Sequence, residues 1–439
     1  MTSASLPKIS IYPILTVNFV GTLGFSIVLP FLVYLVTRLG GNALIYGVMG
    51  ATYSLFQLIG APILGRWSDR FGRRRILLLS QLGTLLSWGI FLIALALPVR
   101  SLLDVDSTVV GTFVITVPLF VLFLARALDG LTGGNVSVAN AYLADITPED
   151  QRGAAFGKMA VSANLGFIVG PALAGLLGAT ALGETLPVMA AFGISLIATL
   201  LIATTLPESD TCQLNEDPEE TNVSQVLGPD QKECYRLRAT QQVSGFSVLR
   251  LPKMSLILGI HFLVFLAFNF FYIAFPVHAA TAIEWSLAQV GIFFSILSLF
   301  MVLVQGPVLT WAMKRAGDRT LVLIGSVLLA VSFPFFSSGN PVLLYAGAAL
   351  LALGNGLMWP SLLAILSKAA DPTIQGAVQG FAGSSAAVAS IAGLILGGLL
   401  YGIVGTGVFV IAAVLTCAVV FLSSALPKTQ TAAEPWEER

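Results

Sequence analysis

Two opposite charges three residues apart, Arg126 and Asp129, are the residues of this sequence best placed to do chemistry. They lie in an apolar run near 116–140, and in a helix they would share one face and could pair. Burial disfavours the charged form of a carboxyl group and a neighbouring guanidinium favours it, so Asp129 could bind and release a proton. The alternative is a permanent structural ion pair.

A second group of charges follows another apolar run. In the segment 58–74 we predict a short turn that combines glycines, an acid and arginines: Gly65, Asp69, Arg70, Gly72, Arg73 and Arg74. Glycine supplies the backbone freedom that a tight turn needs, and the Asp69 carboxylate can pair with arginines. The alternative is a set of positive charges that only fixes the topology.

The composition of the chain is that of a membrane protein. Of 439 residues, 56% are hydrophobic and 10% are charged, with 22 Lys and Arg against 22 Asp and Glu, whereas soluble domains carry roughly 25% charged residues. This excludes an ordinary soluble enzyme. The apolar runs lack the alternation of a transmembrane barrel, so we predict an all-α membrane protein.

Twelve apolar runs have about the length that crosses a bilayer. They lie near 11–36, 44–64, 76–97, 116–140, 154–178, 186–206, 254–276, 288–312, 320–337, 341–366, 377–402 and 405–426. We therefore divide the chain into an N-terminal six-helix half, a central loop, a C-terminal six-helix half and a tail, at 1–206, 207–250, 251–426 and 427–439. Because Lys and Arg favour the cytoplasmic side of short loops, both termini, the loop and the tail are expected in the cytoplasm.

The two halves carry a weak internal repeat. Residues 58–74 align without a gap on residues 303–319, and the fifth apolar run aligns on the eleventh. Two like-oriented six-helix halves around a cavity are an arrangement found in secondary transporters.

Three motifs resemble those of the major facilitator superfamily. Residues 65–74 resemble its G-x-x-x-D-R-x-G-R-R loop, and residues 126–130 resemble its R-x-x-x-G motif in the fourth span. Residues 166–175 resemble G-x-x-x-G-P-x-x-x-G, the fifth-span motif of antiporters. The sequence around 125–147 is most similar to the tetracycline-efflux branch of the twelve-helix drug:proton antiporters.

The resemblance implies a transporter with two pseudo-symmetric six-helix halves that rock to open a cavity to either side. Asp129, with Arg126, would carry the coupling proton. Gating would involve the charged loop, Asp145 as a partner of Arg73 or Arg74, and the small-residue face and proline of the fifth span, which are Gly166, Gly170, Pro171 and Gly175. Glycines at four-residue spacing let another helix approach closely.

Uncharged polar and aromatic residues in the spans that line the cavity of this superfamily are candidates for substrate binding. They are Asn18, Tyr53, Gln57, Asn135, His261, Asn269, Tyr272, Gln305, Asn355 and Trp359. Such a wall suits an amphipathic or cationic organic compound held by stacking and a few hydrogen bonds. Each of these residues could instead form a hydrogen bond between helices.

Asn18 marks a departure from the tetracycline-efflux pattern, which has a carboxylate at this place in the first span. An amide cannot titrate. Either Asp129 has taken over proton coupling or this protein depends less on protons than its relatives.

The function that we expect is proton-coupled export of a small amphipathic compound or drug, such as a tetracycline-like molecule. No Walker loop, zinc signature or nucleophile elbow is present, so we expect no enzyme activity, no cofactor, no metal and no nucleic-acid partner. The expected partners are a small-molecule substrate, protons and the lipid bilayer, for a monomer in the cell membrane, plasma or inner. The alternatives are an uptake or facilitated-diffusion carrier for a sugar or metabolite, which the fifth-span motif disfavours, and a non-transporting membrane sensor.

Overall fold

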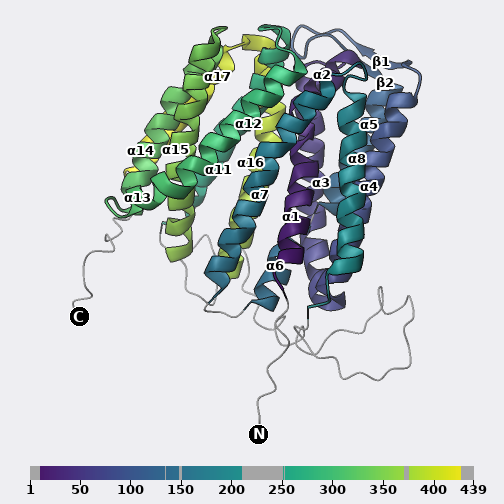
Figure 1. Ribbon diagram of the computed structural model, residues 1–439. Helices are drawn as coiled ribbons and strands as arrows, with labels where there is room; N and C mark the ends of the chain where they lie inside the picture. The colour runs from purple at the N-terminus through teal and green to yellow at the C-terminus, as the bar shows by residue number, and fades with distance from the viewer. Residues whose placement is uncertain are drawn as a thin grey trace, which may run out of the picture.

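The structure is a computed structural model that describes residues 10–133, 135–147, 151–209, 251, 253–369 and 375–426. The central segment 210–250 and the tail 427–439 lie outside the described residues. The described part is a bundle of long helices with one small hairpin (Figure 1). Among the described residues, eleven helical segments are long and apolar enough to cross a bilayer, and α17 is a shorter apolar helix of 17 residues. The prediction of an all-α membrane protein with twelve spans is therefore confirmed.

The helices divide into two groups in chain order. The first bundle contains α1 (Tyr12–Ser26), α2 (Val28–Arg38), α3 (Ala43–Phe71), α4 (Arg73–Ala96), α5 (Val117–Thr132), α6 (Asn135–Ile146), α7 (Arg152–Gly178) and α8 (Thr185–Thr205). The second bundle contains α11 (Met254–Thr281), α12 (Leu287–Leu303), α13 (Leu309–Met313), α14 (Asp318–Ser332), α15 (Pro341–Lys368), α16 (Gln375–Val404) and α17 (Gly407–Ser423). A π-helical turn at Val304–Val308 joins α12 to α13, and a 3-10 turn at Phe333–Ser337 follows α14.

The spans differ from the predicted ones at internal breaks. The first span is split at Ile27 between α1 and α2, and the fourth is split near Gly133 between α5 and α6. The eighth span contains Pro307 within its π-helical turn. Because proline lacks a backbone donor, the helical hydrogen-bond pattern has to change around it.

The structure contains a hairpin that the sequence analysis did not predict. Strands β1 (Ser101–Val105) and β2 (Phe113–Thr116) pair antiparallel, with Leu103 opposite Ile115. The Val114 amide donates to the Gly40 carbonyl at 2.8 Å, which fixes the hairpin to the turn after α2. We call this end of the molecule the hairpin end, and the opposite end, where α4 begins at Arg73, the Arg73 end (Figure 1).

The two bundles meet through α3 with α16 and through α7 with α12. Glycines at these crossings lie against the backbone of the other bundle: Gly47 faces the Leu394 carbonyl, and Gly291 faces the Pro171 carbonyl. Such contacts let the helix backbones approach closely. The Tyr34 hydroxyl also donates to the Trp285 carbonyl at 2.5 Å. These contacts close the molecule at the hairpin end.

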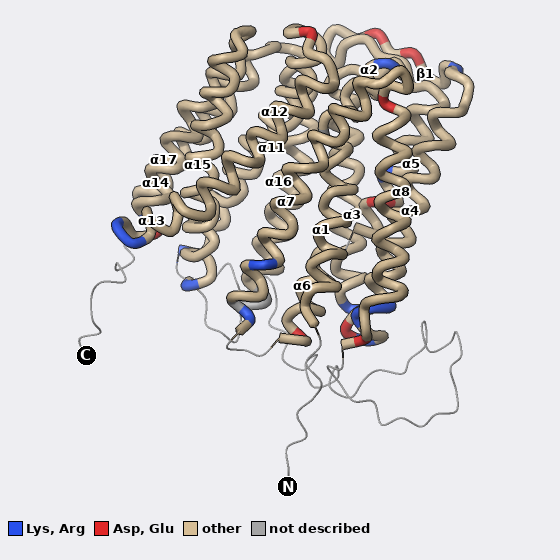
Figure 2. The backbone as a smooth tube through the Cα atoms, in the orientation of Figure 1, with Lys and Arg blue, Asp and Glu red and all other residues tan. Residues whose placement is uncertain are grey.

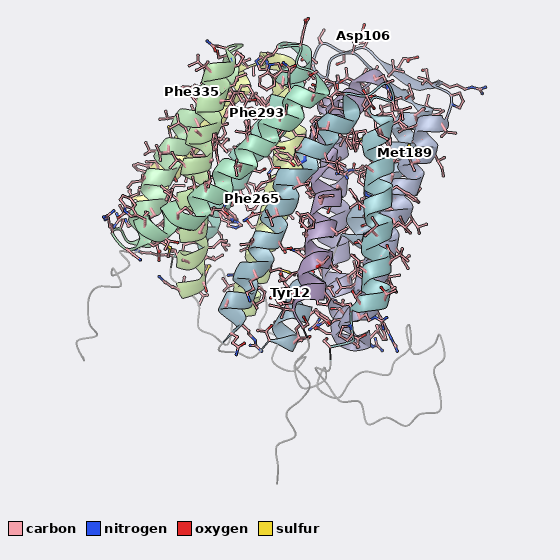
Figure 3. All side chains as sticks on the ribbon, viewed as in Figure 1. Tyr12, Asp106, Met189, Phe265, Phe293 and Phe335 are labelled. Carbon is pink, nitrogen blue, oxygen red and sulfur yellow. The ribbon has the colours of Figure 1, made fainter. Side chains whose placement is uncertain are left out.

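Aromatic side chains fill the second bundle. The ring of Phe275 lies 4.3 Å from that of Phe293, and the ring of Phe271 lies 4.5 Å from that of Phe336, measured between centroids. Figure 3 labels Phe293 near the hairpin end and Phe265 closer to the Arg73 end. Lys, Arg, Asp and Glu gather mainly at the two ends of the helices (Figure 2). The middle of the bundle is therefore almost free of charge, which makes the pair on α5 exceptional.

Candidate functional site

Arg126 and Asp129 form the buried ion pair that their spacing predicted. Arg126 Nη1 lies 3.2 Å from Asp129 Oδ2, and the two residues are 6% and 7% exposed. The Arg126 guanidinium also lies over the Tyr53 ring, 4.7 Å from its centroid. Arg126 Nε is buried without a hydrogen-bond partner among the described residues. The guanidinium therefore has donor capacity left for another group.

Close packing of α3 on α5 holds this pair in place. A Cβ on Gly130 would collide with the Tyr53 carbonyl, and a Cβ on Gly60 would collide with the Leu131 carbonyl. Both positions therefore require glycine, because a larger residue would push the helices apart. The close approach brings Tyr53 under Arg126.

A first cavity lies between the two bundles and is lined by both. We call it the central cavity; its volume is about 460 Å³. It is lined by Arg126 and by five of the predicted substrate residues, which are Tyr53, Gln57, Asn269, Tyr272 and Gln305. Phe268 and Tyr272 stack beside it with ring centroids 6.2 Å apart. A mostly apolar wall with a few polar groups is the usual lining of a small-molecule site.

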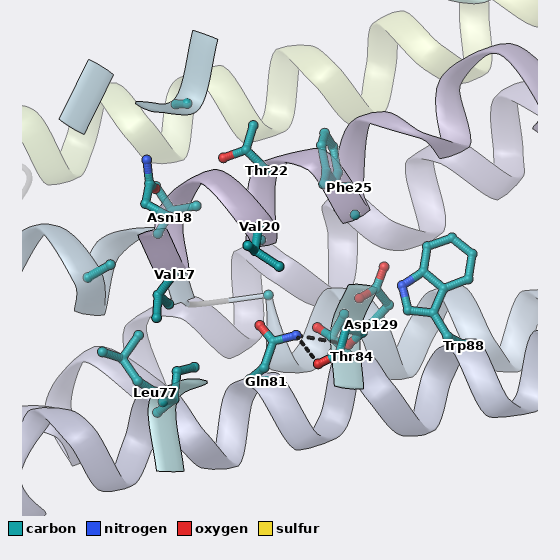
Figure 4. Close-up of a pocket in the computed structure, with 18 of the residues that line it drawn as sticks. Val17, Asn18, Val20, Thr22, Phe25, Leu77, Gln81, Thr84, Trp88 and Asp129 are labelled. Atoms are coloured by element: carbon teal, nitrogen blue, oxygen red, sulfur yellow. Dashed lines mark hydrogen bonds between the residues drawn. The ribbon is translucent and has the colours of Figure 1, made fainter. Parts of the chain in front are cut away.

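A second cavity, of about 340 Å³, lies within the first bundle (Figure 4). We call it the bundle cavity. Asp129, Thr84, Gln81 and Asn18 line it. The two cavities adjoin, and the residues that line both are Phe25, Tyr53, Gln57 and Phe167. The ion pair thus has Asp129 on one cavity and Arg126 on the other.

Several predicted substrate residues also join helices by hydrogen bonds. Asn18 Nδ2 donates to the Met159 carbonyl at 3.1 Å, and Gln57 Nε2 donates to the Gly133 carbonyl at 3.1 Å. Asn269 Nδ2 donates to Ser390 Oγ at 3.2 Å. The alternative role that the sequence left open, hydrogen bonding between helices, is therefore present at these three positions.

Three other candidates are absent from the described linings of both cavities: His261, Asn355 and Trp359. His261 and Trp359 pack on each other and on Phe265, with ring centroids 4.9–5.1 Å apart. Phe265 itself lines the central cavity. These two rings thus support the wall from behind. The side chain of Asn135 lies outside the described residues.

The charged group at the Arg73 end differs from the predicted turn. Helix α3 continues to Phe71, so Gly65, Asp69 and Arg70 are helical, and the turn is made by Gly72 alone. Gly72 has φ +107°, a backbone conformation that favours glycine, whereas a Cβ on Gly65 would meet no atom within 4 Å. The chain reverses within one residue because the polar end of α3 remains helical.

Arg73 is the centre of an ion cluster that links three helices. Its guanidinium contacts Asp145 at 2.8 Å, Asp69 at 2.5 Å and Ser68 Oγ at 2.7 Å. Arg74 instead holds the end of α8, since its side chain donates to the carbonyls of Ile202 and Ala203. Of the two arginines expected as partners of Asp145, the structure thus pairs it with Arg73.

The fifth span, α7, has its small residues against two different partners. Gly166 and Gly170 lie against α1 and its junction with α2, and Ser26 Oγ donates to the Gly166 carbonyl at 2.8 Å. Gly175, one turn beyond Pro171, lies against Ala288 and Gly291 of α12. Helix α7 therefore contacts the second bundle at the hairpin end.

The sequence analysis missed the α4 side of the bundle cavity. Gln81 donates to Ser195 Oγ at 2.8 Å, and Thr84 hydrogen-bonds the Asp129 carboxylate. Glu208, assigned to the polar loop, accepts from the Arg74 amide at 3.0 Å. The sequence does indicate this side of the cavity, because two polar residues lie three positions apart, at 81 and 84, in an otherwise apolar span.

A bundle of membrane-spanning helices with a buried ion pair beside a cavity between two six-span groups defines a class of protein, the multi-pass membrane transporter. The chain belongs to the Major Facilitator Superfamily, which matches residues 14–305 and 257–438. It is a transporter and not an enzyme.

Individual relatives agree with this family. The chain is 28% identical to the class C tetracycline resistance protein of Escherichia coli over 81% of this chain and 80% of that protein. It is 25% identical to the human hippocampus abundant transcript 1 protein over 83% of this chain and 65% of that protein.

Solved structures share the fold. The human organic anion transporter MFSD10 superposes with a TM-score of 0.64 at 21% identity, covering 94% of this chain and 98% of that one. A D-xylose-proton symporter superposes with a TM-score of 0.71 at 14% identity, covering 95% and 98%. At these identities the likeness concerns the fold alone.

Proposed function

We propose that this transporter exports an amphipathic organic compound that carries a positively charged group, in exchange for protons. The observation that carries the proposal is the buried Arg126–Asp129 pair, 3.2 Å apart, at the boundary of the central cavity. The tetracycline resistance proteins among its relatives support a drug of that kind as the cargo. Tetracycline is accordingly the first compound to test.

The central cavity has the chemistry for such a cargo. Stacked rings, including Tyr272 and Phe268, offer flat apolar surfaces, and the amides of Gln57, Gln305 and Asn269 offer hydrogen bonds. Aromatic faces attract cations and stack on planar rings. This supports the substrate role of the cavity-lining candidates. We assign His261 and Trp359 to the support of that wall.

Coupling follows from the electrostatics of the pair. When Asp129 is ionised, the charges of Asp129 and Arg126 cancel, and a cationic substrate can enter the central cavity without repulsion. When Asp129 takes a proton, the positive charge of Arg126 faces the cavity uncompensated and repels such a substrate. Proton and substrate therefore exclude each other, which is the requirement for exchange. Asn18 contributes no charge, so Asp129 takes the role that a first-span carboxylate would have.

Alternating access would proceed by rocking of the two halves, 1–206 and 251–426. The glycine contacts of α7 with α12 would form the seal and hinge at the hairpin end. At the Arg73 end, the cluster of Arg73, Asp69 and Asp145 would break and reform as a latch. Pro171 and Gly175 contact α12 and fit the first role, and Gly166 and Gly170 would hold α7 against α1 beside it. Gly65, Arg70, Gly72 and Arg74 flank the second.

The distribution of Lys and Arg supports an orientation with both termini in the cytoplasm. The Arg73 end would then face the cytoplasm and the hairpin end the outside. We place the protein in the plasma or inner membrane as a monomer surrounded by lipid. Export would start from the cavity open toward the Arg73 end.

The test is transport by purified protein in liposomes. With an imposed pH gradient, we expect labelled tetracycline to accumulate on the acidic side. In Asp129→Asn the rate of this accumulation should fall at least tenfold. Asp106→Asn, in the exposed hairpin, is the matched control. Rates that ignore the gradient would refute proton coupling. Accumulation in the direction of proton flow would indicate an uptake carrier instead, and absence of transport for a broad panel would favour a sensor.

A further inference from the structure

The bundle cavity is lined by Asp129, which is absent from the described lining of the central cavity. We propose that it is a water-filled passage through which the proton leaves Asp129 toward the Arg73 end while substrate enters the central cavity. This inference rests on the proposed function, in which Asp129 carries the coupling proton. It separates the path of the proton from the path of the cargo.

The geometry of α4 gives the passage its direction. Leu77, Gln81, Thr84 and Trp88 all line the bundle cavity, and their spacing of three or four residues places them on one face of the helix. From Leu77 to Trp88 a helix rises roughly 16 Å. Leu77 lies one turn after Arg73, so the cavity extends from near the Arg73 end to the level of Asp129.

The polar lining is sufficient to hold water. Asn18, Gln81, Thr84, Ser195 and Asp129 contribute amide, hydroxyl and carboxylate groups to the wall (Figure 4). A buried water needs about two to four polar partners, whereas a purely apolar cavity stays dry. A volume of about 340 Å³ is far above the roughly 10–15 Å³ that a single water needs. A chain of waters along α4 is therefore possible.

Among the residues around this part of the passage, the Asp129 carboxylate is the group that binds and releases the proton. Arg126 faces it from the same helix, Tyr53 from α3 and Thr84 from α4. Gln81 and Trp88 of α4 and Ser195 of α8 complete this part of the wall. Among these residues Arg126 carries the fixed positive charge. An intramembrane carboxylate ordinarily faces a partner or water; Asp129 has Arg126 as its partner and lines the bundle cavity.

The wall between the cavities keeps the two paths apart. Phe25 packs on Tyr53 and on Phe167, with ring centroids 5.6 and 6.3 Å apart, and all three line both cavities. A substrate in the central cavity would rest against this wall and would not fill the bundle cavity. The proton can then leave Asp129 on one side of these rings while substrate enters on the other side, next to Arg126.

Gly21 allows a test that leaves the central cavity intact. It lines the bundle cavity, and a Cβ at this position would meet no atom within 4 Å. Gly21→Leu would therefore add side-chain volume to the passage at a position where the new Cβ has room. Gly193→Leu is the matched control, because Gly193 also has no atom within 4 Å of an added Cβ and is absent from the described lining of both cavities.

The experiment compares two activities in proteoliposomes. Exchange of labelled for unlabelled tetracycline at equal pH requires only the substrate-loaded carrier, whereas gradient-driven accumulation also requires Asp129 to release its proton through the passage. For Gly21→Leu we expect exchange within twofold of wild type and gradient-driven accumulation at least fivefold slower. Gly193→Leu should match wild type in both. The coupled loss of protons from the liposome lumen, reported by trapped pyranine, should slow in parallel with accumulation.

Each other result has a distinct meaning. Unchanged gradient-driven transport in Gly21→Leu would overturn the passage, and so would an equal fall in both activities, since that indicates damage to the fold or to the substrate site. If wild-type protein exchanges tetracycline but ignores the pH gradient, the proposed coupling fails before the passage is tested.

Discussion

Arg126 and Asp129 form one ion pair, 3.2 Å apart, whose two members line different cavities. Arg126 faces the cavity between the bundles, and Asp129 faces the cavity within the first bundle. In the proposed mechanism this pair links the substrate site to the group that binds the proton. A change in the charge of Asp129 alters the electrostatic energy of Arg126, because one hydrogen bond joins the two groups.

Substitutions of Arg126 should separate its charge from its shape. Arg126→Lys keeps the positive charge but loses the planar group that lies over Tyr53 at 4.7 Å. We expect weaker tetracycline binding, by about 1–2 kcal/mol, which is roughly 5–30-fold in affinity, with proton coupling retained.

Arg126→Gln should lose coupling, because protonation of Asp129 would then leave no positive charge. Binding by fluorescence and transport in proteoliposomes measure the two effects; coupled transport by Arg126→Gln would contradict the mechanism.

Packing of α3 on α5 should be the part of the fold least tolerant of an added methyl group. At Gly130 a Cβ collides with the Tyr53 carbonyl, whereas at Gly65 it meets nothing within 4 Å. We expect Gly130→Ala to destabilise by about 1–3 kcal/mol, the usual cost of overpacking, and Gly65→Ala to be nearly neutral. Thermal unfolding of the detergent-solubilised protein compares them. Equal stability of the two variants would show that the close approach is not required.

The two acids that hold Arg73 should differ in their contribution to stability. Asp145 joins α6 to α4 and its side chain is 14% exposed, whereas Asp69 is one turn from Arg73 and is 37% exposed. Removing the partner of a buried charge costs more than removing an exposed one. We expect Asp145→Asn to lower the unfolding temperature clearly more than Asp69→Asn. The reverse order would mean that the local contact between Asp69 and Arg73 contributes more to stability than the contact between Asp145 and Arg73.

The hydrogen bond from Tyr34 to Trp285 should favour the conformation closed at the hairpin end. It joins the two bundles at 2.5 Å, and a hydrogen bond contributes about 0.5–1.5 kcal/mol. Tyr34→Phe should therefore shift the population toward opening at that end by roughly 2–12-fold. Distances between spin labels on the two bundles measure the shift. Tyr345→Phe, within the second bundle and stacked near the same Trp285 ring, is the control and should cause no shift.

The sequence by itself determined the class of structure and the residues that carry charge. Apolar runs of the length of a bilayer admit only helices or barrels, because backbone groups in lipid must bond within the protein, and these runs lack the barrel alternation. The spacing of Arg126 and Asp129 predicted their pairing, since residues three apart in a helix are neighbours. The ends of the helices were harder to predict from the sequence. Helix α3 continues through a polar segment to Phe71, and the length of an apolar run does not show that the helix extends beyond it.

Only the tertiary structure decided which side chains face which cavity. Asn18, Gln81 and Thr84 come together with Asp129 because α1, α4 and α5 pack around one space, while Trp359 and His261 stack on each other away from the described linings. A polar residue in an apolar helix looks the same in sequence whether it binds a neighbouring helix or faces water. The choice depends on how neighbouring helices rotate and approach. Glycines far apart in the chain, such as Gly60 and Gly130, determine how closely the helices approach. Their importance cannot be seen in the sequence, because it depends on which backbone atoms of another helix lie against them.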